Sequence, residues 1–531
     1  MNLKFYGADK EVTGSCHCLE VNGKRILIDC GLQQGQDEKD NNALPFQAGM
    51  IDYVLVTHAH IDHSGKLPLL VRNGFQGKIY ATGMTCKLLR IMLEDSAHIQ
   101  EMEAQWKQRK HKRSGDEVDE PLYTIADAMK TFRYFNPCRY GQTIYLDEGV
   151  SARFIDAGHL LGSASIELTL TENQTTKVIV FSGDIGNYHQ PIIRDPQYFH
   201  QADYVVMEST YGNRFHEETQ DLVWELARVF DETLSRGGNV VIPSFAVGRT
   251  QELLYFIREM KERFLVKHNP NFLVYVDSPL AMEATKIYDG DLTGYADKAT
   301  VEIINSGFRP ICFPNLHLCK SVEESMALNE DTVPKVIISS SGMCEAGRIR
   351  HHLKHNLWRA ECSVVFVGYQ ANGTLGRMLV NGAHDVKLFG ERVVVNAQIH
   401  NFRGMSGHAD KNGLLHWISE FENEPERVFV VHGEEEVADG FTAELRKMGI
   451  NAFAPDFQAE YDLIQNRFLD MGVPASSLRT KIHKSGSVAY QRLQQVGDMM
   501  LEVIKHNEGG TNKDLGKFAD QLLSLIQKWD R

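Results

Sequence analysis

The sequence predicts an α/β protein in which helices cover β-sheets. Two patterns support this prediction. Over the first two hundred residues, short runs rich in β-branched residues end at turn signals, which is typical of strands buried on both faces of a sheet. From about residue 210, similar runs alternate with helical segments, which indicates βαβ units in a largely parallel sheet and hence a second domain.

The elements of the first region follow in order along the chain. Residues 1–9 are expected to form an N-terminal strand, and further apolar strands are predicted at 25–31, 51–57, 177–184 and 203–208. Helices are predicted near 84–95 and 124–135. Several of these strands run directly into an Asp, a Glu or a His, so the sequence places reactive side chains at strand ends.

The second region begins with a helix at 219–236, which ends at a Gly-Gly stop signal. A second helix is predicted at 249–262. The strands expected around it are 239–243, 272–276, 336–339 and 364–367. Strand signals return near 391 and end at 428–432. The tail beyond about 456 is expected to be mostly amphipathic helix, with polar breaks near 507–513.

The composition sets limits on function. The chain has 531 residues, of which 43% are hydrophobic and 24% charged, a globular balance that argues against a mainly disordered protein. Its 56 Lys and Arg against 70 Asp and Glu give a net charge of −14, unlike a general nucleic-acid coat protein, which has a basic surface. A polyanion would therefore have to bind at a local cationic site.

The sequence also indicates a compartment. No stretch approaches the eighteen apolar residues of a transmembrane helix, and the N-terminus is too polar for a secretory signal. The nine cysteines are scattered and odd in number, which argues against a disulfide framework. We therefore expect a cytoplasmic protein with no membrane partner.

A basic run at 107–113 precedes four acidic residues, Asp116, Glu117, Asp119 and Glu120. Such a block of charge is most simply a solvated loop. A cationic flap beside a polyanion site is the alternative interpretation.

The strongest local signal is the segment T-H-A-H-I-D-H-S-G at residues 57–65. Directly after an apolar strand, it gathers three imidazoles and one carboxylate within six residues: His58, His60, Asp62 and His63. Histidines two residues apart at a strand end can both turn toward one ion, while the next turn can reach a second ion. Neutral imidazole and carboxylate oxygen are ligands that suit Zn²⁺.

Two coordination spheres need further ligands from distant parts of the chain. His159, Asp184 and His432 each stand at the end of a predicted strand, so one edge of a sheet can bring them to the motif. A carboxylate has two oxygens and can bridge two cations about 3.5–4 Å apart. Asp184 is our candidate for that bridge.

The motif H-x-H-x-D-H, with Asp29 upstream and His159 and Asp184 downstream, resembles the metallo-β-lactamase superfamily. The resemblance implies an αββα sandwich with a dinuclear site at one edge. Many hydrolases share the motif, among them glyoxalase II and ribonuclease Z, so it identifies a superfamily and no substrate.

Three later segments resemble motifs A, B and C of the β-CASP nucleases. They are the acid of M-E-S-T-Y-G at 207–212, the histidine of M-S-G-H-A-D at 405–410 and the histidine of V-H-G-E at 431–434. In that family a second domain is inserted into the metallo-β-lactamase domain, and the stretch between Glu208 and His408 matches such an insertion. A histidine at motif C resembles the RNA-acting branch.

Two more segments, 243–252 and 339–348, resemble bacterial and archaeal relatives of the endonuclease subunit of the cleavage and polyadenylation specificity factor. The resemblance covers roughly residues 1–455, and no KH-type RNA-binding domain is expected. It implies a metallo-β-lactamase domain in two segments, an inserted α/β β-CASP domain and a helical C-terminal extension. The expected bounds are 1–208 and 393–455, 209–392, and 456–531.

The family pattern also implies roles for the site residues. It assigns two Zn²⁺ ions per chain, bridged by Asp184, with the remaining ligands divided as His58, His60 and His159 for one ion and Asp62, His63 and His432 for the other. Asp62 is also counted among the catalytic residues. His408 is then the candidate general acid for the leaving oxygen, oriented or charged by Glu208.

Asp29 is expected to orient a ligand rather than to bind metal, with an ordinary turn role as the alternative. Arg249 and Arg348 follow glycines at predicted helix starts, where backbone N–H groups and the positive helix end attract phosphate. Ser341 and Gly342 can add N–H donors at the second of these sites. An ordinary surface position is the alternative for both arginines.

We therefore expect a zinc-dependent ribonuclease that hydrolyses phosphodiester bonds of single-stranded RNA by a two-metal mechanism between two domains. Endonuclease action is expected, with 5′-exonuclease action and a homodimer left open. A hydrolase of a small ester or thioester on the same fold is the first alternative. A non-catalytic RNA-binding member is the second.

Overall fold

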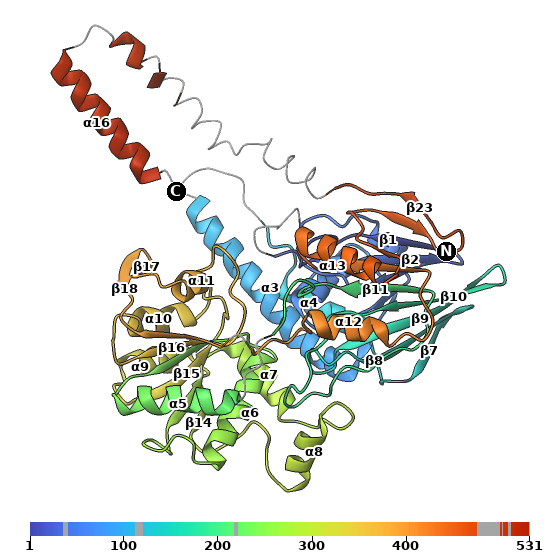
Figure 1. The fold of residues 1–531 in the computed structure, drawn as a ribbon, viewed down its shortest axis with the longest axis horizontal. Coiled ribbons are helices and arrows are strands. Elements are labelled where there is room, and N and C mark those ends of the chain that lie inside the picture. Colours follow the sequence, from blue (N-terminus) through green and yellow to red (C-terminus); the bar gives the residue numbers. More distant parts are fainter. Residues whose placement is uncertain are drawn as a thin grey trace. The chain divides into compact units, whose positions relative to one another are not determined.

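The computed structural model describes residues 1–34, 41–111, 120–216, 221–402, 404–474 and parts of 497–529 (Figure 1). These fall into two compact units, Met1–Gly472 and Val473–Arg531. The first unit holds every predicted site residue. Within the described ranges, no helix is both long and apolar enough to cross a membrane.

The first sheet of this unit has eight strands. In spatial order they are β23 (Arg467–Asp470), β22 (Glu460–Asp462), β1 (Asn2–Phe5), β2 (His17–Val21), β3 (Lys24–Ile28), β4 (Tyr53–Leu55), β5 (Lys78–Thr82) and β6 (Phe135–Cys138). Strands β3 to β6 run parallel to one another, so their carboxyl ends lie at one edge of the sheet. That edge is where the strand-end residues of the sequence are placed.

The second sheet has seven strands. In spatial order they are β21 (Ala452–Phe453), β20 (Arg427–Val431), β11 (Tyr204–Glu208), β10 (Thr175–Phe181), β9 (Ala164–Glu172), β8 (Val150–Asp156) and β7 (Thr143–Asp147). Strands β10, β11 and β20 run parallel, although a long stretch of chain separates β11 from β20. The carboxyl ends of these three strands also share one edge.

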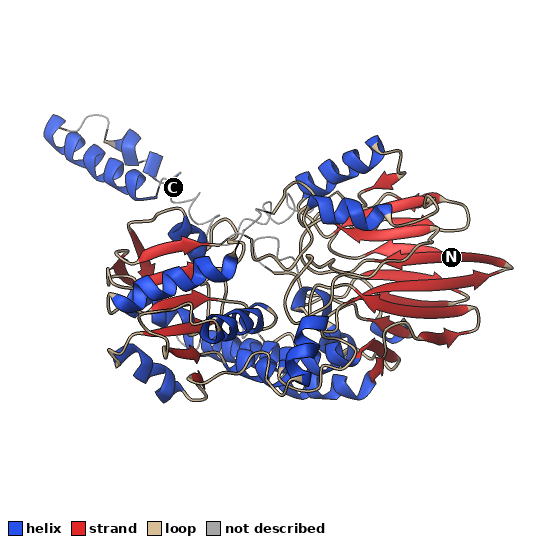
Figure 2. Ribbon diagram, turned by 60° about the horizontal axis from the view of Figure 1, so that its bottom comes forward, coloured by secondary structure: helices blue, strands red, loops and turns tan. Residues whose placement is uncertain are grey.

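The two sheets pack face to face. One buried core joins them, with Phe5 from β1, Ile28 from β3, Phe154 from β8 and Phe429 from β20 among its members. Helices cover the outer faces (Figure 2). They are α2 (Leu67–Arg72), α3 (Gly83–His111) and α4 (Ile125–Thr131) on the first sheet, and α12 (Lys411–Ser419) and α13 (Glu435–Lys447) on the second. The structure confirms the expected αββα sandwich.

The inserted domain has a six-stranded sheet with parallel pairing throughout. Its strands in spatial order are β14 (Leu316–Leu318), β13 (Leu273–Val276), β15 (Lys335–Ser339), β12 (Val240–Pro243), β16 (Ser363–Phe366) and β19 (Gln398–Asn401). The helices of the domain are α5 (Leu222–Ser235), α6 (Arg249–Glu262), α7 (Pro279–Tyr288), α8 (Lys298–Asn305), α9 (Val322–Glu330), α10 (Ile349–Asn356) and α11 (Leu375–Val380). A hairpin of β17 (Asp385–Leu388) and β18 (Glu391–Val394) completes it.

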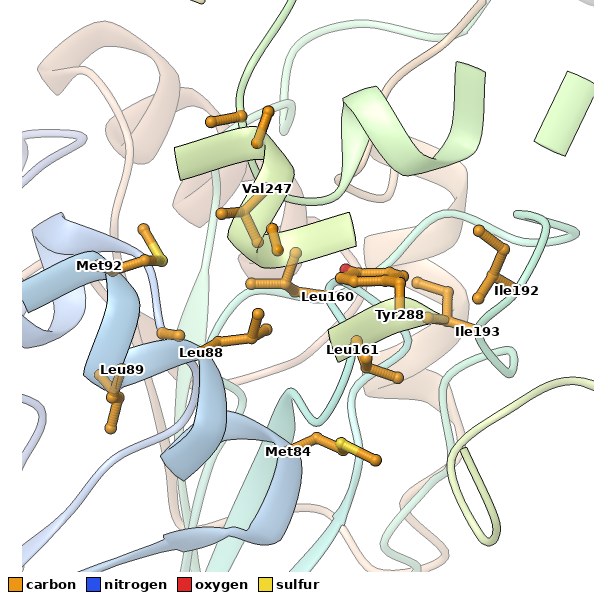
Figure 3. Packing of buried hydrophobic residues seen from close by; sticks show 14 of the residues in the cluster. Met84, Leu88, Leu89, Met92, Leu160, Leu161, Ile192, Ile193, Val247 and Tyr288 are labelled. Atoms are coloured by element: carbon orange, nitrogen blue, oxygen red, sulfur yellow. The ribbon is translucent and has the colours of Figure 1, made fainter. Parts of the chain in front are cut away.

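Apolar side chains join the inserted domain to the sandwich. Figure 3 shows Met84 and Leu88 of α3, Tyr288 at the end of α7, and Leu160 and Leu161 from the loop after β8. All five are buried in one continuous core. Leu160 directly follows the predicted metal ligand His159 in this loop, so this packing fixes the sandwich edge relative to the inserted domain.

Three segments differ from the sequence-based expectations. Residues 107–111 continue helix α3 instead of forming a loop, while 112–119 lie outside the described residues. The stretch after 456 first forms β22 and β23, because β22 pairs with β1 and extends the first sheet. Strand β19 extends the inserted sheet beyond the expected boundary at 392. In the second unit, α16 (Asn512–Trp529) is helical.

Candidate metal centre

Side chains from both central sheets converge at one edge of the sandwich. They come from the turns after β4, β8, β10 and β20 and from the short helix α1 (Ile61–Ser64) that follows the β4 turn. The structure brings together all seven predicted ligands: His58, His60, Asp62, His63, His159, Asp184 and His432. They form two groups, with Asp184 in contact with both.

Asp184 lies between the two groups. Its Oδ2 atom is 3.3 Å from Nε2 of His58 and 3.4 Å from Nε2 of His159. Its Oδ1 atom is 3.2 Å from Nε2 of His63 and 3.7 Å from Nε2 of His432. The carboxylate therefore offers one oxygen to each group, which is the arrangement needed to bridge two cations.

The first group has the donor spacing of a metal site. Nδ1 of His60 lies 3.0 Å from Nε2 of His58 and 3.2 Å from Nε2 of His159. Ligands held about 2.0–2.1 Å from a tetrahedral zinc ion are about 3.3 Å apart. With Oδ2 of Asp184, these three nitrogens supply four donors at that spacing.

The second group is similar in size. Nε2 of His63 lies 3.1 Å from Nε2 of His432, and that nitrogen of His432 lies 3.6 Å from Oδ2 of Asp62. Three residues and Oδ1 of Asp184 therefore surround one point. Imidazole nitrogen and carboxylate oxygen are ligands that zinc accepts.

Hydrogen bonds behind the rings decide which nitrogen carries the proton. Nδ1 of His159 lies 3.1 Å from the carbonyl oxygen of Gly407, which can only accept, so Nδ1 donates and Nε2 presents its lone pair. Burial holds the pKa of His159 well below its usual range and lowers the pKa of His60 to about 3. Both rings are therefore neutral, the form that binds metal.

Asp29 and Thr57 hold two further ligands from behind. The carboxylate of Asp29 accepts hydrogen bonds from the Thr57 N–H at 2.8 Å, the Thr57 hydroxyl at 2.9 Å and Nδ1 of His63 at 2.7 Å. Because the Thr57 hydroxyl donates to Asp29, it accepts from Nδ1 of His58, 3.1 Å away. His58 and His63 thus both turn Nε2 lone pairs toward Asp184.

The donor set fits bound cations. Oδ1 of Asp184 is buried and receives no hydrogen bond from the described residues. Thr210 donates to the carbonyl of His432 at 3.3 Å and accepts from Nδ1 of His432 at 3.1 Å, so Nε2 of His432 also carries a lone pair. The lone pairs of His63 and His432 then face each other at 3.1 Å. A cation between them satisfies both, together with the carboxylate oxygen.

His408 lies beside Asp184 but belongs to neither ligand group. Its Nδ1 is 3.2 Å from Oε2 and 3.3 Å from Oε1 of Glu208, and its Nε2 is 3.9 Å from Oδ2 of Asp184. Burial alone lowers the pKa of His408, but the carboxylates of Glu208 and Asp184 outweigh burial and raise it to about 9. Nε2 points at the ligand cluster, and both carboxylates favour the protonated form of the ring, which a proton donor requires.

The two arginines predicted to bind phosphate are held within the inserted domain. Arg249 begins helix α6 and forms an ion pair with Glu252 one turn later. Arg348 precedes α10, and its Nη1 lies 2.6 Å from Oδ1 of the buried Asp277. Within the described residues, neither shares a hydrogen bond or ion pair with a ligand of the two groups, so phosphate binding by either stays a prediction.

Ser341 and Gly342 lie in the loop between β15 and α10. The Ser341 hydroxyl accepts from the N–H of Glu345 at 3.1 Å, and the carbonyl of Gly342 accepts from the side chain of Gln370 at 3.0 Å. These contacts shape the loop. A phosphate-binding role for the two residues also stays a prediction.

Thr57, Thr210 and Gly407 were not among the predicted residues, although each orients a ligand. Thr57 stands directly before His58 and Gly407 directly before His408, while Thr210 lies two residues after Glu208. A residue close to a motif residue in the sequence is therefore a candidate for orienting a ligand, but the sequence does not reveal which ring it will contact. Gly407 contacts His159, which is far away along the chain.

Family models match three segments of the chain. Residues 18–200 match the metallo-beta-lactamase superfamily domain, residues 250–379 the Beta-Casp domain, and residues 392–455 the Zn-dependent metallo-hydrolase RNA specificity domain. Their order along the chain is that of a sandwich interrupted by an inserted domain.

Several characterised proteins are similar over most of the chain. Ribonuclease TTHA0252 of Thermus thermophilus is 38% identical over 437 residues, which cover 82% of this chain and 94% of that protein. The transcription termination factor FttA of Methanocaldococcus jannaschii is 30% identical over 84% of this chain and 69% of its own length. The factor of the same name from Methanosarcina mazei is 32% identical, over 81% and 66%.

Proposed function

The chain belongs to the β-CASP family of metallo-β-lactamase-fold RNA nucleases, and from that premise we propose that it is a zinc-dependent ribonuclease acting on single-stranded RNA. The proposal assigns two zinc ions to the two ligand groups at the sandwich edge. It further assigns internal cleavage of the strand as the main activity.

The geometry supports an assignment of residues to the two ions. His58, His60 and His159 would hold one ion, while Asp62, His63 and His432 would hold the other. Asp184 would contribute one oxygen to each. When bound, two zinc ions supply a water that is nucleophilic near neutral pH and neutralise charge on the phosphate.

The protein's own part in the reaction is proton delivery and orientation. His408 keeps a proton because Glu208 lies against its Nδ1 and Asp184 lies near its Nε2. A leaving oxygen needs that proton as the phosphodiester bond breaks. Glu208 is itself fixed, since it accepts a hydrogen bond from the N–H of Ile185 at 2.5 Å.

The pairing of His408 with Glu208 carries the proposal, because a simple metal store needs no proton donor beside its ligands. The test is His408→Ala in the full chain. We expect cleavage of single-stranded RNA to fall by about 10²- to 10⁴-fold, the usual contribution of a general acid. Zinc content, measured by elemental analysis, should stay at two ions per chain.

His416→Ala is the matched control, because that histidine lies half exposed on α12 and contacts Glu420 rather than the site. It should cleave RNA like the wild type. Full activity in His408→Ala would overturn the assignment of the proton donor. Wild-type turnover of a small thioester with no action on RNA would instead favour an esterase on the same fold.

The archaeal relatives named transcription termination factor suggest a second use of the same chemistry. A nuclease that cuts RNA emerging from a polymerase would release transcripts. Stalled elongation complexes with labelled RNA test this use: release that requires both the protein and His408 supports it. Cleavage of free RNA without effect on such complexes contradicts it.

A further inference from the structure

Two arginines lie against one tyrosine ring near the metal centre. Cζ of Arg214, from the loop after β11, is 5.2 Å from the ring centroid of Tyr369. Cζ of Arg377, from helix α11, is 5.3 Å from the same centroid. Tyr369 follows strand β16 of the inserted domain, while Arg214 follows β11, the sandwich strand that precedes the insertion. The cluster of Arg214, Tyr369 and Arg377 is called the arginine clamp below.

A second ring connects the arginine clamp to the proton donor. Cζ of Arg214 is 4.8 Å from the ring centroid of Tyr211. The Tyr211 ring in turn lies 5.8 Å from the His408 ring, nearly perpendicular to it at 80°. The clamp therefore begins one side chain away from His408, the proposed proton donor to the leaving group.

The charges of the arginine clamp lack carboxylate partners among the described residues. The hydrogen bond of the Arg214 side chain goes to the neutral Oδ1 of Asn213 at 3.4 Å. Nε of Arg377 is buried and has no hydrogen-bond partner in the same part of the chain. Like charges held around one ring repel each other, and an anion between or beside them removes that cost.

Stacking also leaves the guanidinium donors free. A guanidinium group over an aromatic face keeps its in-plane N–H groups available, and their fork matches the oxygens of a phosphate. In a protein with a net charge of −14, two cations near the ligand cluster without a carboxylate partner among the described residues favour local binding of an anion.

We propose that Tyr369 positions Arg214 and Arg377 to bind backbone phosphates of the RNA strand on the leaving-group side of the scissile bond. The proposal rests on the proposed ribonuclease function and names the subsite that holds the departing strand. Tyr369 is a positioning residue, and the two arginines make the contact. This subsite would supply the attraction for RNA that the acidic surface as a whole lacks.

The test measures binding and its salt dependence. The full zinc-loaded chain is titrated onto a short labelled oligouridylate with phosphorothioate linkages, which keep the backbone charge and resist hydrolysis. Each phosphate contact to a single strand contributes about 0.7 to the slope of log affinity against log salt. Arg214→Gln and Arg377→Gln should each lower the slope by about that amount. Tyr369→Leu should weaken binding by about ten-fold, while Tyr369→Phe, which keeps the ring, restores it.

Arg228→Gln is the control, because this arginine is exposed on α5 and paired with Glu232. An unchanged slope in both clamp variants, or an equal change in Arg228→Gln, would overturn the clamp. If the wild type cleaves RNA but the clamp variants keep their slopes, only the clamp fails. If the wild type neither binds nor cleaves RNA, the ribonuclease proposal fails and the clamp fails with it.

Discussion

Nδ1 of His63 lies 2.7 Å from Oδ2 of Asp29, and both side chains are buried, Asp29 directly after strand β3 and His63 in helix α1. Among the described residues, His63 is the member of the second ligand group that hydrogen-bonds Asp29, and this bond sets the direction in which the ring presents its lone pair. A residue that touches a ligand from behind in this way controls metal affinity without binding the metal.

Asp29→Asn should weaken zinc binding by about ten- to a hundred-fold, the usual effect of losing such a support. Asparagine removes the charge behind His63 but tolerates the positive φ of 62° at this position. Competition with a coloured chelator measures the affinity. Asp385→Asn, at the surface hairpin, is the control and should bind zinc normally. Equal affinity in Asp29→Asn would show that the support is dispensable.

Removal of zinc should lower the thermal unfolding temperature and abolish RNA cleavage. Without cations, Nε2 of His63 and Nε2 of His432 lie 3.1 Å apart and Oδ1 of Asp184 has no hydrogen bond from the described residues, so the site loses the ion that would bind all three atoms. A site saturated a hundred-fold above its dissociation constant adds about 2.7 kcal/mol to the free energy of unfolding. Differential scanning calorimetry before and after zinc is restored measures the gain. Asp184→Asn should lose most of it, and an identical midpoint with and without zinc would contradict the assignment.

Stability should respond to pH through Lys261 in the inserted domain. Burial lowers the pKa of Lys261 to about 8, below the roughly 10.5 of an unfolded lysine. Between these values the unfolded chain binds more protons, so the unfavourable contribution of the buried ammonium fades as pH rises. The advantage in melting temperature of Lys261→Met over the wild type should therefore shrink between pH 7 and pH 10.

Lys286→Met, at an exposed lysine on α7, gives the comparison. The difference in melting temperature between Lys286→Met and the wild type should stay constant over the same pH range. Lys261→Met also removes the hydrogen bond from Lys261 to the carbonyl of Phe272. This loss is the same at every pH, so it changes the size of the difference in melting temperature but not its dependence on pH. A flat curve for Lys261→Met would contradict the prediction.

Gly248→Ala should disturb the metal edge from a distance. Gly248 begins helix α6 with φ 84° and ψ −75°, a backbone conformation that side chains rarely adopt. An added Cβ would also lie 2.9 Å from Cδ1 of Leu160, the residue after His159. We expect a loss of about 1–3 kcal/mol in the free energy of unfolding and a lower rate of RNA cleavage.

Gly237→Ala separates the two causes, because Gly237 has a similar φ of 82° but open space around its Cβ position. Gly237→Ala should lower the free energy of unfolding and leave the rate of RNA cleavage unchanged. Denaturant titration and RNA kinetics on both variants test the comparison. Equal effects on cleavage would mean that Leu160 does not transmit the disturbance.

Much of the fold follows from local sequence. Helix α6 has the bounds that its apolar pattern predicted, 249–262. Strand β11 ends at Glu208 and strand β20 ends directly before His432, where their apolar runs end. The clustering of the predicted ligands could be inferred from the sequence, because the carboxyl ends of parallel neighbouring strands share one edge of a sheet.

Other features depend on partners far away in the chain. Strands β22 and β23 are short, and β22 forms because it pairs with β1, which no local pattern shows. Arg249 forms an ion pair with Glu252, one helical turn later in α6. Arg348 forms an ion pair with Asp277, which directly follows strand β13. The sequence alone does not show which acceptor an arginine binds, because the folded structure decides which carboxylates lie beside it.

The insertion also sets the order in which the protein becomes active during synthesis. Strand β20, which pairs with β11 and carries His432 at its end, follows the whole inserted domain in the chain. A ribosome therefore releases six of the seven proposed ligands well before the last. On the proposed function, a nascent chain carries an incomplete centre and leaves its own message intact until β20 has emerged and docked beside β11.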